Sequence, residues 1–394
     1  MGGGKEWWFI RIKEKLNNYF LIKKQQIIQR LYWHFPFLFY LISFQSIKLI
    51  ILIIIIFIIF IFKIIGDESK QLEEILRIYG DTRYLTINLD TSADKCGGLG
   101  NMMWRTASLY VIGKQLNRSI YFDGNYKCFY EYKEEFREIF ENNYKIFKFM
   151  HPKKQHVKIV SFGERCCHYD SPDRLTDESA QLIKIWGNYL QSFKYLRNYK
   201  KQIRKFFAFS SQNKLKAYQF AQKLFKSQSI VNQEFKICVH TRREFKICVH
   251  TRRGDFVELQ QSTNKHFTEK AISYILNSVK KRYLNISIIL FGDDNNFMNH
   301  IEIADNVTIY TPTIRSRAVN LCFAINYCNS LLITAPTSTY AWWMGYLLPE
   351  GSPIFYYSCE RSCRHISKKD FFPTEWLPLT INFEGKIEVD DNPF

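Results

Sequence analysis

Apolar and polar residues alternate along most of this chain in blocks whose length and spacing separate strands from helices. Short apolar or β-branched runs bounded by glycine and polar residues predict buried strands. Between these runs, apolar residues recur three and four positions apart, which predicts amphipathic helices. The predicted strands are 85–89, 119–122, 245–250, 286–291, 307–310, 331–334 and 353–357, and the predicted helices are 103–111, 176–228, 267–282, 316–329 and 340–348.

The order of these elements predicts an α/β fold. Strand and helix patterns alternate in both halves of the chain, and such alternation is typical of parallel sheets with helices on both faces. A chain of 394 residues is long enough for two such domains and one anchor. We expect a basic tail and pre-membrane segment at 1–47, a transmembrane helix at 48–66, a polar stem at 67–83, and two Rossmann-like domains at 84–230 and 231–394.

The expected anchor is the run 49–65, which is apolar apart from Lys63. Its length is at the short end of what spans a bilayer. An apolar stretch at 35–44 precedes it, so the span could also begin earlier and be tilted. Basic residues outnumber acidic ones before the run, which places that end in the cytosol and the rest of a type II protein on the lumenal side. A cleaved signal peptide is disfavoured, because no small-residue cleavage site follows the run.

The formal net charge of +18 favours anionic ligands or surfaces. A nucleic-acid partner would suit this charge, but the anchor disfavours it. Ten cysteines in an oxidising lumen permit disulfides, with Cys359–Cys363 the expected local pair and Cys96–Cys128 a further candidate. Cys166 and Cys167 lack the spacing of a zinc site. Three glycosylation sequons begin at Asn117, Asn285 and Asn306.

The segment that ends the strand 245–250 carries the most informative chemistry. His250, Thr251, Arg252, Arg253, Gly254 and Asp255 follow one another where strand gives way to loop. The guanidinium fork suits phosphate oxygens better than an ammonium does. On an extended strand His250 and Arg252 share a face, so Arg252 is the expected phosphate ligand and Arg253 points away. A structural ion pair between Arg253 and Asp255 is about as probable from this motif alone.

Three further motifs accompany this segment. A glycine loop and helix start span 96–104 with the order Cys-Gly-Gly-Leu-Gly-Asn-Met-Met-Trp, Phe-Gly-Asp-Asp ends at Asp294, and Thr-Ser-Thr-Tyr-Ala-Trp-Trp begins at Thr337. The set resembles the α-1,2-fucosyltransferases of glycosyltransferase family 11 from residue 84 to the C-terminus. At Met102 family members usually carry glutamine.

The resemblance implies a GT-B fold, in which an N-terminal acceptor domain at 84–230 faces a C-terminal donor-binding domain at 231–394. It implies inverting transfer of L-fucose from GDP-fucose to the 2-hydroxyl of a terminal galactose on a glycan, at a Golgi membrane. In this family pattern His250 contacts the nucleotide, Arg252 the β-phosphate, and Ser338 and Thr339 the phosphates or the sugar. Ser338 and Thr339 also begin a helix, where they could act simply as N-caps.

The remaining candidates complete the expected site. Gly98, Gly100 and Asn101 are expected to close over the diphosphate, and Arg253 is expected to assist. Asp293 and Asp294 are adjacent, so they point apart, make a poor metal site, and would hold ribose, base or loop amides unless they form a plain turn. Asp255 is a candidate general base but more readily fixes the arginines. We expect no metal requirement and no cofactor.

Residues 234–243 are repeated without change as 244–253. Only the second copy continues into Gly254 and Asp255, so it is assigned to the site, although the first copy could compete for the same strand position. Two rivals to the expected activity remain. One is an inactive homologue that binds nucleotide or glycan without transfer, and the other is a metal-dependent transferase for a different nucleotide sugar.

Overall fold

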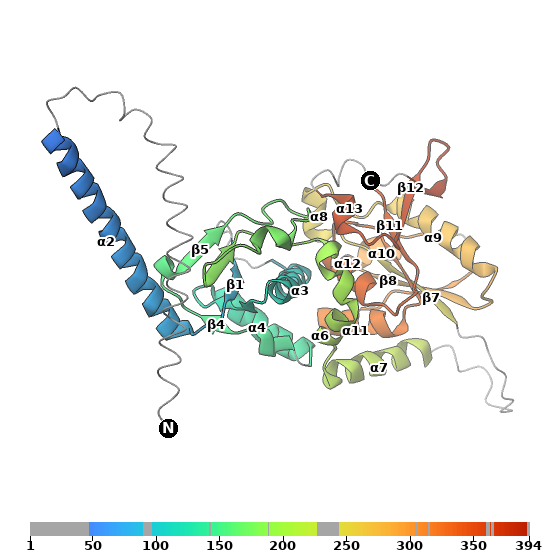
Figure 1. Ribbon diagram of the computed structural model, residues 1–394. Helices are drawn as coiled ribbons and strands as arrows, with labels where there is room; N and C mark the ends of the chain where they lie inside the picture. The colour runs from blue at the N-terminus through green and yellow to red at the C-terminus, as the bar shows by residue number, and fades with distance from the viewer. Residues whose placement is uncertain are drawn as a thin grey trace. The chain divides into compact units, whose positions relative to one another are not determined.

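The computed structural model describes residues 47–89, 97–141, 143–187, 189–226, 244–303, 306–313, 316–359, 363 and 366–391. The chain forms two compact units, Met1–Asp81 and Thr82–Phe394. In the first unit the structure describes the helix α2 (Ile47–Tyr79), drawn in blue in Figure 1. The residues predicted to form a polar stem are helical up to Tyr79. Among the helices of the described residues, none combines the length and the apolar character needed to cross a membrane.

The second unit begins with a small parallel sheet. Its strand order is β2-β1-β6-β5, and every neighbouring pair is parallel. A second parallel sheet consists of the two strands β3 and β4, which lie between β2 and β5 in the sequence. The strands are β1 (Tyr84–Ile87), β2 (Ser119–Ile120), β3 (Phe122–Asp123), β4 (Phe149–Met150), β5 (Val157–Val160) and β6 (Leu182–Ile185).

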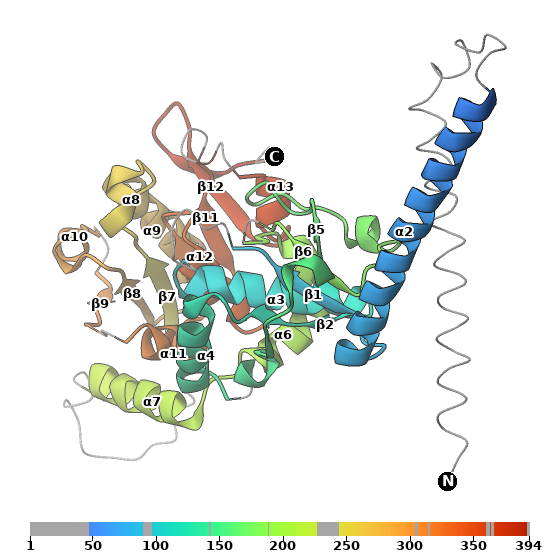
Figure 2. The same cartoon turned by 90° about the vertical axis from the view of Figure 1, so that its left-hand side faces the viewer.

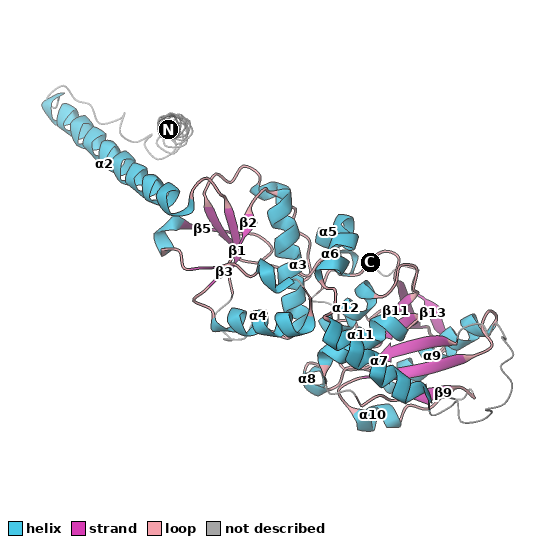
Figure 3. Ribbon diagram, turned by 90° about the horizontal axis from the view of Figure 1, so that it is seen from below, coloured by secondary structure: helices cyan, strands magenta, loops and turns pink. Residues whose placement is uncertain are grey.

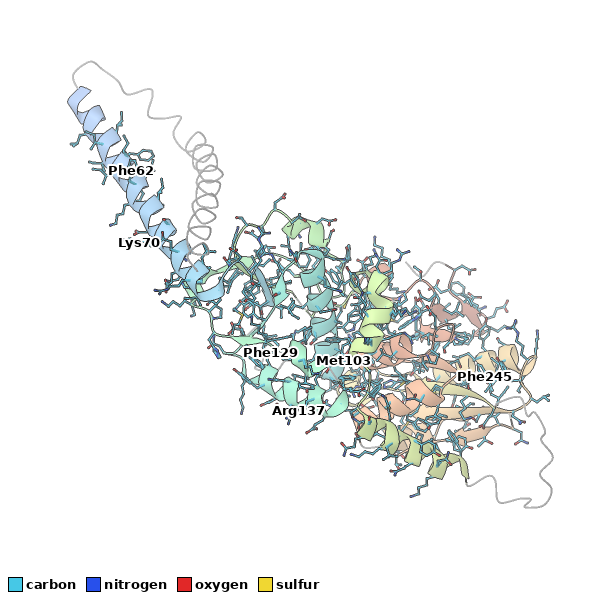
Figure 4. The ribbon with its side chains drawn as sticks, turned by 60° about the horizontal axis from the view of Figure 1, so that its bottom comes forward. Phe62, Lys70, Met103, Phe129, Arg137 and Phe245 are labelled. Carbon is cyan, nitrogen blue, oxygen red and sulfur yellow. A yellow bond between two sulfur atoms is a disulfide. The ribbon has the colours of Figure 1, made fainter. Side chains whose placement is uncertain are left out.

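Helices pack around these strands. The most deeply buried is α3 (Leu99–Gln115), where Met103 is fully buried among the packed side chains drawn in Figure 4. A helix that is apolar on most of its sides belongs in a core rather than at a surface. The other helices of this region are α4 (Lys127–Ile139), α5 (Phe193–Leu196), α6 (Lys200–Phe206) and α7 (Ser211–Lys226), with 3-10 turns η3 (Asn143–Ile146), η4 (Lys154–His156), η5 (Pro172–Leu175) and η6 (Arg197–Tyr199).

The larger sheet has seven strands in the order β13-β12-β11-β10-β7-β8-β9, and only the β12–β13 pair is antiparallel. Figure 3 shows these strands as a group separate from the smaller sheet. The strands are β7 (Phe245–His250), β8 (Ile286–Phe291), β9 (Thr308–Tyr310), β10 (Ser330–Ile333), β11 (Ile354–Tyr357), β12 (Leu377–Ile381) and β13 (Ile387–Val389). Its helices are α8 (Gly254–Glu258), α9 (Lys265–Lys280), α10 (Asn295–Asn299), α11 (Arg317–Tyr327), α12 (Thr339–Leu347) and α13 (Lys368–Phe371).

The central strand β7 is buried on both faces. Ile247 and Val249 pack in one hydrophobic cluster, whereas Cys248 between them packs in the other. Successive side chains of a strand point to opposite faces, so a strand covered on both sides reads as a continuous apolar run. This is the physical reason that the sequence predicts β7 without an alternating pattern.

Tryptophans join the α3 region to the larger sheet. The Trp104 ring on α3 lies 4.1 Å from that of Trp342 and 5.3 Å from that of Trp343, measured between centroids. Trp342 and Trp343 are fully buried, so they form core rather than a sugar-binding surface. Figure 2 shows the helices α3 and α12 close to one another. Packing of such large rings fixes the two helices firmly together.

Most predicted elements are present, with one correction. The stretch 176–228 was expected to be helical throughout, but it contains the strand β6 at Leu182–Ile185. The boundary expected at residue 230 lies between two described segments and stays a prediction. The first copy of the repeat, 234–243, lies outside the described residues, and the second copy forms β7.

The disulfides are partly as expected. The predicted Cys359–Cys363 pair is confirmed, and an unexpected disulfide joins Cys248 to Cys328. Cys128 is disulfide-bonded, while its expected partner Cys96 lies outside the described residues. The sequon residues Asn117, Asn285 and Asn306 are all exposed.

Candidate functional site

A cavity of about 670 Å³ lies at the carboxyl ends of β7 and β8 and at the start of α3 and α12. Ligands of parallel α/β sheets bind at this edge. The residues that line it are Gly98, Leu99, Gly100, Asn101, His250, Thr251, Arg252, Asp255, Phe256, Gly292, Asp293, Asn295, Pro312, Thr313, Arg317, Asn320, Ser338, Thr339 and Tyr340. The four sequence motifs therefore meet in one place.

Two helix N-termini face this cavity. Gly98 is the N-cap of α3, and Ser338 is the N-cap of α12, where its hydroxyl accepts a hydrogen bond from the Ala341 amide at 3.4 Å. The helices touch where Gly100 meets Thr339, because a Cβ on Gly100 would lie 2.7 Å from the Thr339 hydroxyl oxygen. The first amides of a helix are unpaired and favour anions. Ser338 can thus act both as the N-cap of α12 and as a ligand-binding residue.

Further bonds hold the glycine loop. The indole of Trp343 donates to the Gly100 carbonyl at 3.0 Å, and the Gln191 amide donates to the Asn101 side-chain oxygen at 3.0 Å. Met102, which stands where the family pattern has glutamine, is fully buried. Its side chain therefore packs in the core, whereas Asn101, in the first turn of α3, lines the cavity.

His250 is a buried imidazole at the cavity wall. Only 5% of the residue is exposed, and its Nδ1 atom has no hydrogen-bond partner among the described residues. Burial lowers the pKa of His250 to about 3, and the charge of Arg252 acts in the same direction. The ring is therefore neutral at ordinary pH.

Arg252 is held by two carboxylates. Its Nη2 atom lies 2.6 Å from Asp255 Oδ1, and its Nη1 atom lies 3.0 Å from Asp293 Oδ2. About a third of the side chain remains exposed at the cavity. These bonds fix the plane of the guanidinium, so the fork is oriented before a ligand arrives.

The Arg253 side chain points away from the cavity. It does not line the cavity, and its guanidinium lies over the Phe297 ring at 4.8 Å and donates to Ser262 Oγ at 3.3 Å. The ion pair considered between Arg253 and Asp255 is not formed, because Asp255 pairs with Arg252 instead. The expectation that the two arginines point apart agrees with this geometry, whereas the expectation that Arg253 assists in donor binding stays a prediction that its position away from the cavity does not support.

The adjacent aspartates also separate. Asp293 lines the cavity and accepts a hydrogen bond from the Arg253 amide at 2.8 Å, whereas Asp294 caps α10 by accepting from the Phe297 amide at 2.9 Å. Asp293 thus holds a loop amide, one of the roles considered for the pair, whereas Asp294 holds an amide of the α10 helix. Asp294 faces α10 rather than the cavity.

Several lining residues were not among the expected ligands. Arg317 pairs with Glu135 of α4 at 2.5 Å, and the Tyr340 hydroxyl donates to the Arg317 carbonyl at 2.6 Å. The Asn320 side-chain oxygen is buried without a partner among the described residues. Phe256 in α8, and Pro312 and Thr313 in the loop after β9, also line the cavity and carry no distinct sequence signal.

Among the described residues, no group of three or more His, Cys, Asp or Glu side chains is placed to hold a metal ion. The expectation of metal-free chemistry stays a prediction that a chelator can test.

Residues 175–380 match the family described as "Glycosyl transferase family 11", which is more than half of the chain. A "Galactoside 2-alpha-L-fucosyltransferase" from Caenorhabditis elegans is 27% identical over 335 residues, which are 77% of this chain and 79% of the relative. The "Putative galactoside 2-alpha-L-fucosyltransferase svh-11" of the same organism is 26% identical over 80% of this chain and 84% of its own. The crystal structure of "NodZ alpha-1,6-fucosyltransferase soaked with GDP-fucose" shares 14% identity, with a TM-score of 0.41, over 79% of this chain and 100% of that chain.

Proposed function

The chain belongs to glycosyl transferase family 11 and is a fucosyltransferase of that type, and from this premise we propose that it moves L-fucose from GDP-fucose to the 2-hydroxyl of a terminal galactose on a glycan. The observation that carries the proposal is the meeting of Arg252, neutral His250 and two helix N-termini at one cavity. Each of these groups stabilises a diphosphate leaving group. The acceptor rests on the names of the relatives.

Each residue of the cavity has a separate role in the proposed transfer. Arg252 bonds the diphosphate, and a charge-assisted bond of this kind contributes about 1.5–3 kcal/mol. The amides at the start of α3 and α12 bind the remaining phosphate oxygens, and Asn101 closes the loop over them. His250 bonds the nucleotide through a nitrogen that carries no charge. The anomeric carbon inverts, and no metal takes part in the chemistry.

Asp255 has a supporting role in this scheme. Its side chain is 62% exposed and already pairs with Arg252. A general base must reach the acceptor hydroxyl, whereas this carboxylate is engaged in holding the arginine plane. We therefore assign Asp255 to positioning Arg252 rather than to proton removal.

The proposed setting is the Golgi membrane, with a single-pass type II orientation and a GT-B catalytic part in the lumen. The two parallel sheets with a cavity at their helix N-termini support the GT-B arrangement. Disulfides and three exposed sequons are compatible with a lumenal environment. The anchor at 48–66 rests on the sequence, and carbonate extraction followed by protease protection of the full chain would test it.

The decisive experiment measures fucose transfer from GDP-fucose to galactose-terminated acceptors, with and without chelator, for the wild type, Arg252→Ala and Arg253→Ala. We expect transfer that survives the chelator, is nearly abolished by Arg252→Ala, and falls much less in Arg253→Ala. Donor binding without turnover would instead support an inactive homologue. Activity lost in chelator, or seen only with another nucleotide sugar, would support a metal-dependent transferase.

A further inference from the structure

Cys166 and Cys167 are adjacent cysteines whose sulfur atoms lie 2.6 Å apart. The disulfide bond length is about 2.05 Å, so a small movement would join them. Cys166 is partly exposed and Cys167 is 2% exposed, and neither is in a disulfide. Cys167 has a φ of 63°, in the left-handed region that non-glycine residues rarely adopt.

Both thiols contact one amide. Gln191 Oε1 lies 3.3 Å from the Cys167 sulfur and 3.7 Å from the Cys166 sulfur. The same side chain donates from Nε2 to Asn101 Oδ1 at 3.0 Å, and Asn101 lines the cavity. Gln191 is 5% exposed, so its amide has little freedom to find water in place of these partners.

The segment that carries Gln191 is fixed to α3. The Ser108 hydroxyl of α3 donates to the Leu190 carbonyl at 2.9 Å, and Leu190 is 2% exposed. Gln191 is thus a rigid link with the thiol pair on one side and the donor loop on the other. A change at the sulfur atoms alters the partners of Oε1, and so the orientation in which Nε2 meets Asn101.

We propose that Cys166 and Cys167 form a thiol–disulfide modification site, and that oxidation of this site weakens the binding of the nucleotide sugar by Asn101. The dithiol state donates to Gln191 and supports the loop, whereas the disulfide state has no S–H donor. Adjacent cysteines close the smallest ring a protein disulfide can form, and strained disulfides belong to the readily reduced, regulatory class. The effect on the donor rests on the proposed function, but formation of the disulfide does not.

The chemistry is a thiol–disulfide exchange with a small-molecule disulfide of the glutathione class. The Cys166 thiolate attacks one sulfur of that disulfide, which forms a mixed disulfide and releases one small thiolate. The Cys167 sulfur then attacks the Cys166 sulfur, gives up its proton, and releases the second small thiol. Two electrons pass to the oxidant, and one intramolecular S–S bond replaces the intermolecular one. The contact with the Cys167 sulfur lowers the pKa of the Cys166 thiol and favours it as the attacking group.

The test equilibrates the full chain in mixtures of reduced and oxidised glutathione and then blocks free thiols with an alkylating reagent. Mass spectrometry of the peptide that holds Cys166 and Cys167 reports the disulfide, and GDP-fucose affinity is measured on the same samples. We expect a reversible disulfide and a fall in affinity of about three- to tenfold in its presence, as for loss of one buried hydrogen bond.

Three variants sharpen the result. Cys166→Ser removes the attacking thiol and should make affinity independent of the redox buffer, whereas the matched control Cys322→Ser, another free buried cysteine, should respond as the wild type does. Gln191→Leu should weaken donor binding in both redox states without preventing the disulfide.

A pair that stays fully alkylated in the most oxidising buffer overturns the proposal. A disulfide that forms without any change in affinity, in a protein that binds GDP-fucose, overturns its link to Asn101. If the pair oxidises reversibly but no GDP-fucose binds in either state, the modification site stands and the proposed donor fails.

Discussion

At the scale of single residues, the carboxylates around Arg252 decide what Asp255 does. Loss of an exposed ion pair costs about 0.2–1 kcal/mol, whereas loss of a general base costs about 10²- to 10⁴-fold in rate. We expect Asp255→Asn to reduce kcat/KM for GDP-fucose only about two- to fivefold and to leave the pH profile of kcat unchanged. Steady-state kinetics from pH 5 to 8 will check this, and loss of the acidic limb together with a thousandfold fall in kcat would make Asp255 the base.

His250 should make folding stability depend on pH. Its folded-state pKa of about 3 lies below the unfolded value of 6.5, so the unfolded chain binds the proton first as pH falls. The stabilising contribution is complete above pH 6.5 and is lost as pH falls toward 3. At pH 5.5 the loss amounts to about 1.4 kcal/mol. Urea unfolding of the unit Thr82–Phe394 at pH 7.5 and 5.5 should show this loss, and His250→Gln should reduce it.

At the scale of elements, the contact between α3 and α12 depends on Gly100. A methyl group there would lie 2.7 Å from the backbone of Thr339, so the helix starts must separate. We expect Gly100→Ala to destabilise the unliganded protein by about 1–3 kcal/mol, as overpacking does, and to weaken GDP-fucose binding. Gly98→Ala is the matched control for stability, because a Cβ at Gly98 meets nothing within 4 Å. Equal melting temperatures for the two variants would show that α3 and α12 can separate at this contact without loss of stability.

The Cys248–Cys328 disulfide ties β7 to the end of α11. Its sequence separation is 80, whereas that of Cys359–Cys363 is 4. Because a longer closed loop restricts the unfolded chain more, the first bond should contribute about 2–3 kcal/mol more than the second. Denaturant unfolding of Cys248→Ala/Cys328→Ala and of Cys359→Ala/Cys363→Ala compares them directly. A larger loss in the second variant would contradict the chain-entropy account.

The same elements show what the sequence could and could not predict. The strands β7 and β8 are mainly apolar because both faces are buried, so their predicted bounds agree with the structure. The strand β6 was missed because four residues inside a polar, helix-like stretch give no distinct pattern. The Arg252–Asp293 ion pair joins segments some forty residues apart. The sequence motif suggests only an ion pair between its own residues, Arg253 and Asp255. Such pairings, like the Cys248–Cys328 bond, depend on sheet register that no motif states.

At the scale of the whole molecule, the repeat poses a question of which copy occupies the central strand. The second copy forms β7, and it alone leads into the turn at Gly254, where a Cβ would lie 2.7 Å from Asp293 Oδ2. The first copy is followed instead by Glu244, and a side chain at the position of Gly254 could not be accommodated without a shift of Asp293. The residue that follows each copy, rather than the sequence within the copy, therefore determines which copy forms β7.

The lack of space for a side chain at Gly254 predicts the outcome of deleting residues 234–243. The deletion shortens the connection between Lys226 and Phe245 by ten residues and removes the competing copy, while leaving β7 and Gly254 intact. Loop-closure entropy alone favours the shorter chain by about 0.7 kcal/mol. We expect unchanged kcat/KM and a slightly higher melting temperature than the wild type. Deletion of 244–253 yields the same polypeptide, so the control is Gly254→Glu. This variant places after the second copy the residue type that follows the first copy, and it should abolish donor binding.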